Sequence, residues 1–345
     1  MKHILFSLAI MFFVLPYHQA SERAYKQTVL TPHLKVRIGE SDNVVYTSSF
    51  HMAWKMLQNK ILKEEVKTAQ NIPLVGYLNS SQPAKIDEKH SVNMAGFVSD
   101  GIASEIDRAM LNKFNRTVDL SDYTDRPSNI ICYSFFKKAL LFKTKFETFG
   151  QPFPFYSGGN QSDVECFGIW NAGKSEQHQG IRELVKVIDF QGTHDFIVSI
   201  GNPDDNDELI VAVLKPEETL SGMVETVFKR KNNTIPSNLE DGDRLIIPKV
   251  IVDISKKYME LYGVHLKNKG FEDYFFAEAI HDVNFTLNES GAFADSEAKL
   301  VLKKGPGPRT MMVNRPFLLM MREKKTDAPY LAVWIANPEL LVEMN

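Results

Sequence analysis

The chain has 345 residues, of which 43% are hydrophobic, and its 40 basic and 43 acidic side chains leave a formal charge of −3. A chain of this length can bury a substantial core, as one large domain or two. The near balance of charge argues against nucleic acid as a partner, because proteins that bind it concentrate positive charge.

The first twenty residues have the pattern of a secretory signal. Lys2 supplies a positive start, residues 4–15 form an apolar run too short to span a bilayer comfortably, and Ala20 ends a small-residue cleavage site. No later stretch approaches the length of a membrane span, and no linker or repeat interrupts the chain. The sequence therefore predicts a signal peptide over residues 1–20 and a single domain, secreted and extracellular, over residues 21–345.

Hydrophobic periodicity and turn residues predict the remaining elements in chain order. They are short strands within 30–48, a helix over 50–68, a polar loop over 70–92, a helix over 102–114, an aromatic-rich strand and its continuation over 128–149, strands over 164–170 and 183–191, a hairpin of 196–200 with 209–214, and helices over 218–230 and 253–262.

Residues 291–299 alternate between small and larger side chains. In a strand, successive side chains point to opposite faces, so the small residues would share one face and mostly charged residues the other. Such a segment can slide between two existing strands, with its small face on a packed core. The small set is Ala292, Ala294, Ser296 and Ala298; the other set is Phe293, Asp295, Glu297 and Lys299.

The segment that follows, residues 303–309, cannot be a central strand. It reads Lys-Lys-Gly-Pro-Gly-Pro-Arg; proline lacks the ladder donor and glycine weakens pairing. The sequence predicts an exposed loop that proteases can reach.

This combination resembles the serpin family at its hinge and reactive-centre loop. Glu289 and Gly291 match the family's hinge, His281 matches a histidine beneath its central sheet, and Arg315-Pro316-Phe317 matches the strand that restarts after the loop. The resemblance is good over residues 195–340. It implies an α+β fold with three β-sheets, surrounding helices and a reactive-centre loop at about residues 291–313.

The resemblance also implies a function, namely suicide inhibition of a serine protease. A trypsin-like protease needs a basic side chain for its acidic specificity pocket. The hinge register of common family members places the cut after Gly305, where Pro306 would follow, so we favour Lys304 as the bait and Lys304–Gly305 as the reactive bond. Lys303 and Arg309 are the alternative specificity residues.

The chain departs from the family pattern in its N-terminal half. The stretch Asn43 to Ser49 lacks the family's proline, and Thr47 and Ser48 are the nearest counterparts of the serine in the region where the central sheet opens, beside His281. Residues 119–129 leave no room for the helix that normally crosses the central sheet. Missing helices could remove the metastability on which inhibition depends.

Other motifs favour ordinary structural roles. Residues 168–175 fit the phosphate-loop pattern letter by letter, but the sequence predicts a strand after them where a helix is needed, so we expect no nucleotide site. The acidic run 204–208 lacks the glycine and distant glutamate of an EF-hand loop. No nucleophile elbow or metal-ligand spacing occurs, so we expect no metal, no cofactor and no enzymatic activity.

The sequence leaves open whether the two cysteines form a disulfide and which sequons carry glycans. Cys132 and Cys166 lie in apolar segments and read as two buried thiols, although a disulfide is permitted outside the cytosol. Six sequons are candidates for glycosylation in a secreted eukaryotic protein, and some must be chance. They begin at Asn79, Asn115, Asn160, Asn232, Asn284 and Asn288.

Two other functions stay open. The runner-up is a non-inhibitory binding or carrier protein that kept the fold; bulky or charged residues on the inward hinge face would favour it, and they are absent. A cysteine protease as target would change only the partner. In either case we expect a monomer without a membrane or nucleic-acid partner.

Overall fold

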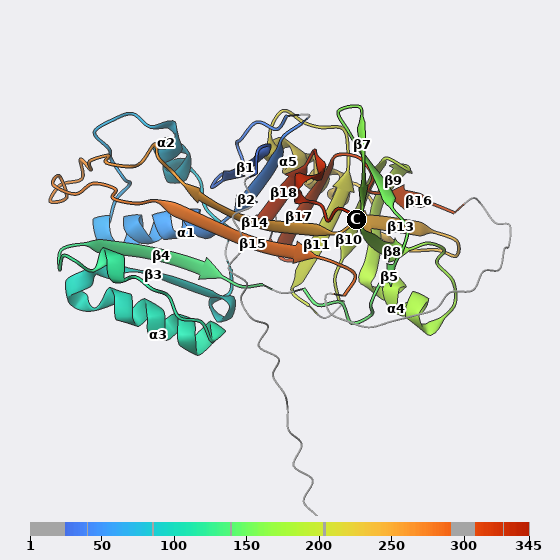
Figure 1. Cartoon of the computed structure of the whole chain (residues 1–345), viewed down its shortest axis with the longest axis horizontal. Helices are drawn as coiled ribbons and strands as arrows, with labels where there is room; N and C mark the ends of the chain where they lie inside the picture. The colour runs from blue at the N-terminus through green and yellow to red at the C-terminus, as the bar shows by residue number, and fades with distance from the viewer. Residues whose placement is uncertain are drawn as a thin grey trace, which may run out of the picture.

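The computed structural model describes residues 25–39, 41–84, 86–138, 140–202, 205–290, 308–326 and 328–344 (Figure 1). The helices are α1 (Ser49–Met56), continued by a π-helical segment (Leu57–Leu62), α2 (Pro73–Ser80), α3 (Ile102–Phe114), α4 (Glu176–Leu184) and α5 (Leu220–Asn232). The strands are β1 (Thr28–Thr31), β2 (Asn43–Thr47), β3 (Ser91–Phe97), β4 (Ile130–Phe136), β5 (Glu147–Thr148), β6 (Phe153–Ser157), β7 (Asn160–Val164), β8 (Cys166–Ile169), β9 (Val185–Gly192), β10 (Asp195–Ile200), β11 (Asp207–Val213), β12 (Ser237–Asn238), β13 (Arg244–Pro248), β14 (Val250–Lys257), β15 (Ile280–Leu287), β16 (Thr310–Met312), β17 (Phe317–Glu323) and β18 (Pro329–Ile335).

An eight-stranded sheet forms the centre of the fold, in the order β1-β2-β18-β17-β11-β10-β9-β12. Its middle strands are continuous apolar runs because both faces are covered. On β17, for example, Phe317 and Leu319 face one buried cluster, while Leu318 and Met320 face another.

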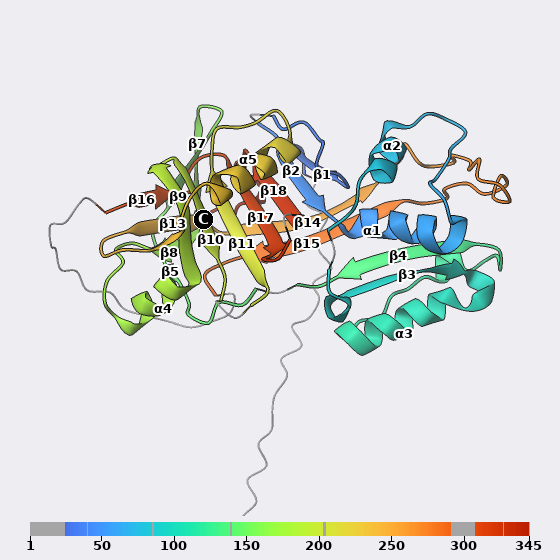
Figure 2. The same cartoon turned by 180° about the vertical axis from the view of Figure 1, so that it is seen from behind.

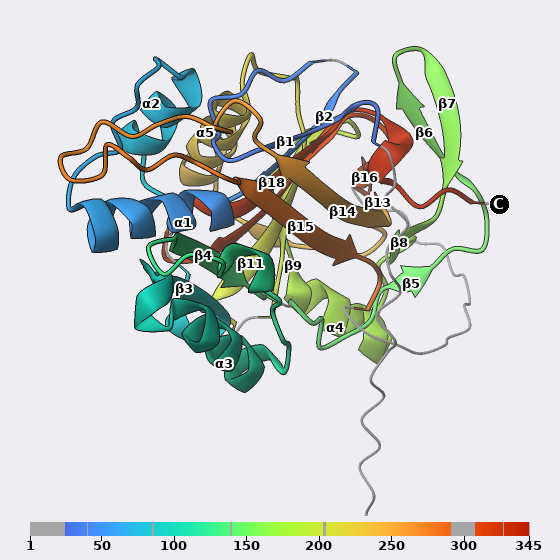
Figure 3. The same ribbon diagram turned by 60° about the vertical axis from the view of Figure 1, so that its left-hand side comes forward.

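Each face of this sheet has its own cover. Helix α5 covers one face with Leu220, Met223 and Val227 (Figure 2). The pair β14–β15 lies in front of the other face (Figure 3). Val252 of β14 and Leu287 of β15 belong to the buried cluster on that side.

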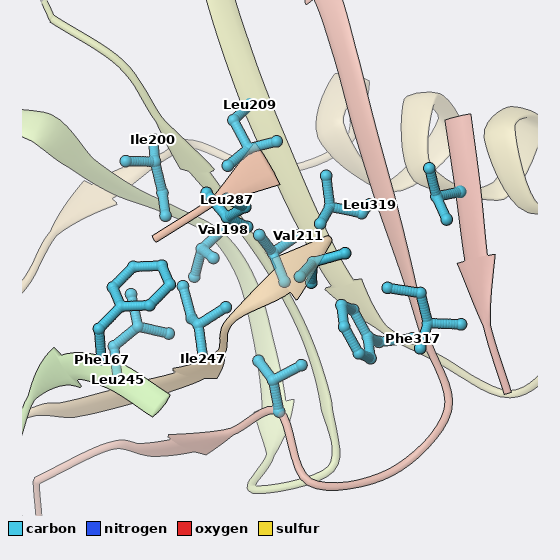
Figure 4. Close-up of a cluster of buried hydrophobic side chains, with 14 of the residues drawn as sticks. Phe167, Val198, Ile200, Leu209, Val211, Leu245, Ile247, Leu287, Phe317 and Leu319 are labelled. Atoms are coloured by element: carbon cyan, nitrogen blue, oxygen red, sulfur yellow. The ribbon is translucent and has the colours of Figure 1, made fainter. Parts of the chain in front are cut away.

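A four-stranded sheet, β16-β13-β8-β5, adjoins this core. Figure 4 shows Phe167 of β8 and Ile247 of β13 facing Val198 and Val211 of the eight-stranded sheet, with Leu287 of β15 between the layers. The eight-stranded sheet, the four-stranded sheet and Leu287, the last residue of β15, therefore share one hydrophobic core.

Two strand pairs lie beside these sheets. Strands β3 and β4 pair antiparallel, as do β14 and β15, and among the described residues no strand pairing joins the two units. Helix α1 contacts β3, β4 and β15. In Figure 1, β4 runs below β15 and both arrows point the same way. Among the described residues, the facing edges of β4 and β15 thus have no strand partner, and both strands contact helix α1.

Several predicted elements are confirmed. Helix α3 covers residues 102–114 and buries Ile102, Ile106 and Met110, which recur every fourth residue on one face. The predicted hairpin is β10–β11 and the predicted helix over 218–230 is α5. The predicted helix over 50–68 forms only to Leu62, because Lys63 takes the left-handed conformation that ends it.

The predicted helix over 253–262 is wrong. Residues 250–257 form β14, which pairs with β15 from Val250 opposite Leu287 to Lys257 opposite Ile280, and turns follow from Met259. The short apolar run was ambiguous between helix and strand, and a partner some thirty residues later decided it.

Three other boundaries differ from expectation. The loop predicted over 70–92 contains α2, which begins with Pro73 at its first turn. The aromatic segment predicted as a strand over 128–149 is extended only from Ile130 to Phe136 in β4 and again briefly in β5. The strand predicted over 183–191 begins at Val185, because α4 occupies the chain to Leu184.

Both cysteines are free thiols. Cys132 is on β4 and Cys166 is on β8, and burial raises the pKa of each to about 12. A thiol with so high a pKa is a poor nucleophile, so both act as small apolar side chains. None of the helices in the described ranges is long and apolar enough to cross a membrane.

Candidate functional site: the sheet-opening cluster and the two ends of the loop

His281 is the centre of a buried polar cluster beneath β15. Its side chain reaches the start of α1, where Thr47 Oγ1 lies 2.7 Å and Ser49 Oγ 3.1 Å from Nε2. On the other side of the ring, Tyr258 Oη lies 3.1 Å from Nδ1. The cluster ties β15, the end of β14 and the β2–α1 junction together under the sheet.

Burial keeps His281 neutral. It is 3% exposed, and desolvation, with a smaller contribution from the positive charge of Lys256, lowers the pKa of His281 to about 3. A neutral imidazole offers one donor and one acceptor. Hydroxyl groups on both sides can match either tautomer, so the ring is satisfied without charge.

Of the two residues predicted to lie beside His281, the structure brings Thr47 to it but not Ser48. Ser48 is fully buried, yet its Oγ faces Met52 Sδ at 3.7 Å rather than His281. Ser49 and Tyr258 were missed. No local pattern marks Tyr258, because the sequence predicts a helix over 253–262 that includes it.

We expect stability to fall as the pH drops below 6.5. A histidine with a lowered folded pKa binds fewer protons in the native state than in the unfolded chain, so acid favours unfolding by up to ~1.4 kcal/mol per pH unit per group. His281 contributes between its ordinary pKa of 6.5 and about 3, and His33 and His51, whose pKa values burial lowers to about 4, contribute in the same window. Urea unfolding from pH 7 to 4 measures the slope. His281→Asn should flatten it, and an unchanged slope would show that His281 titrates normally.

The hinge glutamate is anchored at the end of β15. Lys249 Nζ lies 3.1 Å and Lys145 Nζ 3.9 Å from the Glu289 carboxylate, and Phe146 N donates to Glu289 O at 3.0 Å. Ser290 is buried beside it. The described chain therefore leaves β15 from a fixed point.

Arg309 anchors the chain immediately before β16. Its backbone N donates to Asp243 Oδ1 at 2.7 Å, and Nε and Nη2 donate to Oδ2 at 2.9 and 2.6 Å. Its guanidinium also donates to Ser237 Oγ at 2.8 Å and to Asn238 O at 2.7 Å. Because Asp243 is 1% exposed, this is a largely buried, charge-assisted pair that fixes the start of β16 to the start of β13.

Arg309→Met should lower the free energy of unfolding by about 3 kcal/mol. It would leave the buried Asp243 carboxylate without its cation, which is far costlier than losing a surface pair. Arg315→Met is the matched control, since Arg315 is exposed, and it should stay within about 0.5 kcal/mol of the original protein. Equal stabilities of the two variants in urea would contradict the anchoring role.

The other predicted loop residues lie outside the described residues. They are Gly291, Ala292, Ala294, Ser296 and Ala298 of the hinge, and Lys303, Lys304 and Gly305 at the predicted reactive bond.

The phosphate-loop-like segment is occupied by its own contacts. The expected strand after it is wrong, because α4 begins at Glu176. However, Trp170 N donates to Glu147 Oε2 at 3.1 Å and Gly173 N to His178 Nδ1 at 2.9 Å. A phosphate cradle needs such N–H groups for the ligand, and a glutamate carboxylate there would repel it. In the described ranges, no group of three or more His, Cys, Asp or Glu side chains could hold a metal ion.

Residues 214–338 match the family model described as "Serpin (serine protease inhibitor)". Over these residues the chain is similar to the serpin family. The matched region runs from the end of β11 through α5, β13, β14 and His281 to the end of the closing hairpin β17–β18. No curated protein matches the chain in a sequence search.

Two insect serpins are similar in overall structure. A serpin of the beetle Tenebrio molitor, Serpin48, described as highly specific, has 10% identity and a TM-score of 0.46, over 86% of this chain and 92% of its own. Serpin-12 of the moth Manduca sexta has 14% identity and a TM-score of 0.49, over 88% and 94%. The likeness to the family rests on the match of residues 214–338. The predicted α+β serpin fold is confirmed, with the described strands in an eight-stranded sheet, a four-stranded sheet and three two-stranded units.

Proposed function

We propose that this protein is a secreted inhibitor of a trypsin-like serine protease and acts by suicide trapping. The protease serine attacks the carbonyl carbon of Lys304, the bond to Gly305 breaks, and an ester joins Lys304 to the protease while Gly305 gains a free amine. The cut loop then enters between β4 and β15. This movement carries the ester away and distorts the protease before water can hydrolyse the ester.

The observation that carries this proposal is the pair of facing edges on β4 and β15, for which the described part of the chain provides no strand partner. An unpaired strand edge presents a row of N–H and C=O groups that can accept another strand. The chain leaves β15 at Glu289, and the residues that follow carry small side chains on alternate positions. A strand inserted there would complete the sheet over α1 and the His281 cluster.

The finer features of the proposal follow from the sequence. We propose a signal peptide over residues 1–20, a monomer outside the cell, and no enzymatic activity or cofactor. The sequons Asn115, Asn160, Asn232 and Asn284 are exposed and suit glycans. Asn79 does not, because its amide binds Trp54 Nε1 at 3.0 Å and Val66 O at 2.9 Å.

The deciding experiment is incubation with trypsin, followed by a denaturing gel and by mass spectrometry of the intact products. A detergent-stable complex and release of the peptide beginning at Gly305 would support trapping. Cleavage without a complex would favour the non-inhibitory binding or carrier function. Papain in parallel tests the cysteine-protease alternative with the same loop.

A further inference from the structure

The β3–β4 and β14–β15 units are joined by a side-chain hydrogen bond at one end. Tyr123 Oη donates to Glu278 Oε2. Tyr123 lies in the loop of residues 119–129 before β4, and Glu278 stands two residues before β15 begins. The contact links the start of one strand to the start of the other.

Tyr123 is fixed to the β3–β4 unit. Its ring packs against the buried cluster formed by α3, β3 and β4. Asn129 Nδ2 donates to Tyr123 O at 3.1 Å, and Val98 N, at the end of β3, donates to Asn129 O at 2.9 Å. The loop therefore belongs to this unit, and the hydroxyl of Tyr123 reaches across to the other.

Glu278 belongs to the other unit. Lys257 Nζ, at the end of β14, lies 3.0 Å from Glu278 Oε1, and Tyr258 N donates to Ala279 O at 2.9 Å. The Tyr123 hydrogen bond, followed by Lys257, lowers the pKa of Glu278, and the same hydrogen bond is the main cause that raises the pKa of Tyr123 to about 12. At neutral pH the bond thus joins a phenol to a carboxylate, which is a strong charge-assisted pair.

The position of this bond relative to the open edges gives it a function. Because β4 and β15 run in the same direction, the bond lies at their starts, whereas the hinge follows the end of β15 (Figure 1). A strand that folds back along β15 meets Leu287 first and Ile280 last. It needs about one residue for each residue of β15, so its far end arrives beside the Tyr123–Glu278 bond.

We propose that Tyr123 and Glu278 form a strap that holds the far ends of β4 and β15 together and slows the entry of a strand between them. Tyr123 lies in the loop of residues 119–129, which is too short for a helix that crosses the central sheet. In place of such a helix, one hydrogen bond would hold the two strands together. This inference rests on the proposed function, because it assumes that a strand enters there.

Tyr123→Phe tests the strap, since it removes the hydroxyl and keeps the packed ring. The probe is a fluorescent synthetic peptide with the sequence of residues 291–300, and the readout is its rate of uptake by the intact protein. We expect uptake to be between about ten- and a hundredfold faster in Tyr123→Phe, the range for losing a hydrogen bond to a charged group. Glu278→Gln should give a smaller increase, because an amide oxygen still accepts. Tyr262→Phe, on the exposed turn after β14, should leave the rate unchanged.

The outcomes separate the strap from the proposed function. Uptake by the original protein at the same rate as by Tyr123→Phe would overturn the strap and leave trapping intact. No peptide uptake by either protein, together with no gain in thermal stability after cleavage of the loop, would overturn both. Circular dichroism confirms that each variant is folded before the rates are compared.

Discussion

Replacing Lys304 with alanine is expected to abolish the covalent complex with trypsin. The specificity pocket of such a protease holds a carboxylate. Without a basic side chain at position 304, that carboxylate stays unpaired when the loop binds the protease. We expect the rate of complex formation to fall by at least about a hundredfold. The measurement is the second-order rate of inhibition, with the complex followed on a denaturing gel.

Two matched variants fix the register of the reactive bond. Lys303→Ala should inhibit nearly as well as the original protein, and it is the decisive control because the two lysines are adjacent. If Lys303→Ala loses inhibition and Lys304→Ala keeps it, the bond lies one residue earlier. Arg309→Met should still inhibit trypsin, since the Arg309 guanidinium is already bound to Asp243 and does not serve as the specificity residue.

The second large effect is expected from Ala294→Arg. If the loop inserts with its small face inward, an arginine there must bury a charge without a partner, which costs several kcal/mol. Insertion would then be slower than hydrolysis of the ester, and the protein would become a substrate. We expect the yield of complex per cleaved chain to fall more than about tenfold.

The control for this change lies on the adjacent residue. Asp295 belongs to the opposite face of the predicted strand, so Asp295→Arg should keep the complex. Gel densitometry of complex and cleaved chain gives the partition directly. Equal partition in the two variants would contradict insertion with this register, whereas trypsin would still be expected to cut both loops.

Local sequence pattern was sufficient to predict an element where hydrophobic periodicity or turn residues mark it. The apolar face of α3 recurs every fourth residue, and the turn-bounded apolar runs of β10 and β11 predict a hairpin. The resemblance around Glu289 and Arg315 led to the family that residues 214–338 match. His281 was likewise found from its sequence position, and the structure places it 2.7 Å from Thr47 as expected for neighbours beneath the sheet.

Long-range contacts decided the rest. Residues 253–257 became strand because β15 pairs with them, and Ser49 rather than Ser48 faces His281 because the junction of β2 and α1 sets the direction of each side chain. The sequence by itself determined the periodic elements, the small-residue hinge and the basic loop, since these follow from the order of neighbouring residues. Only the tertiary structure decided that Arg309 is held by Asp243 and that Tyr123 reaches Glu278, because each pair joins residues at least 66 positions apart, for which no local pattern provides a signal.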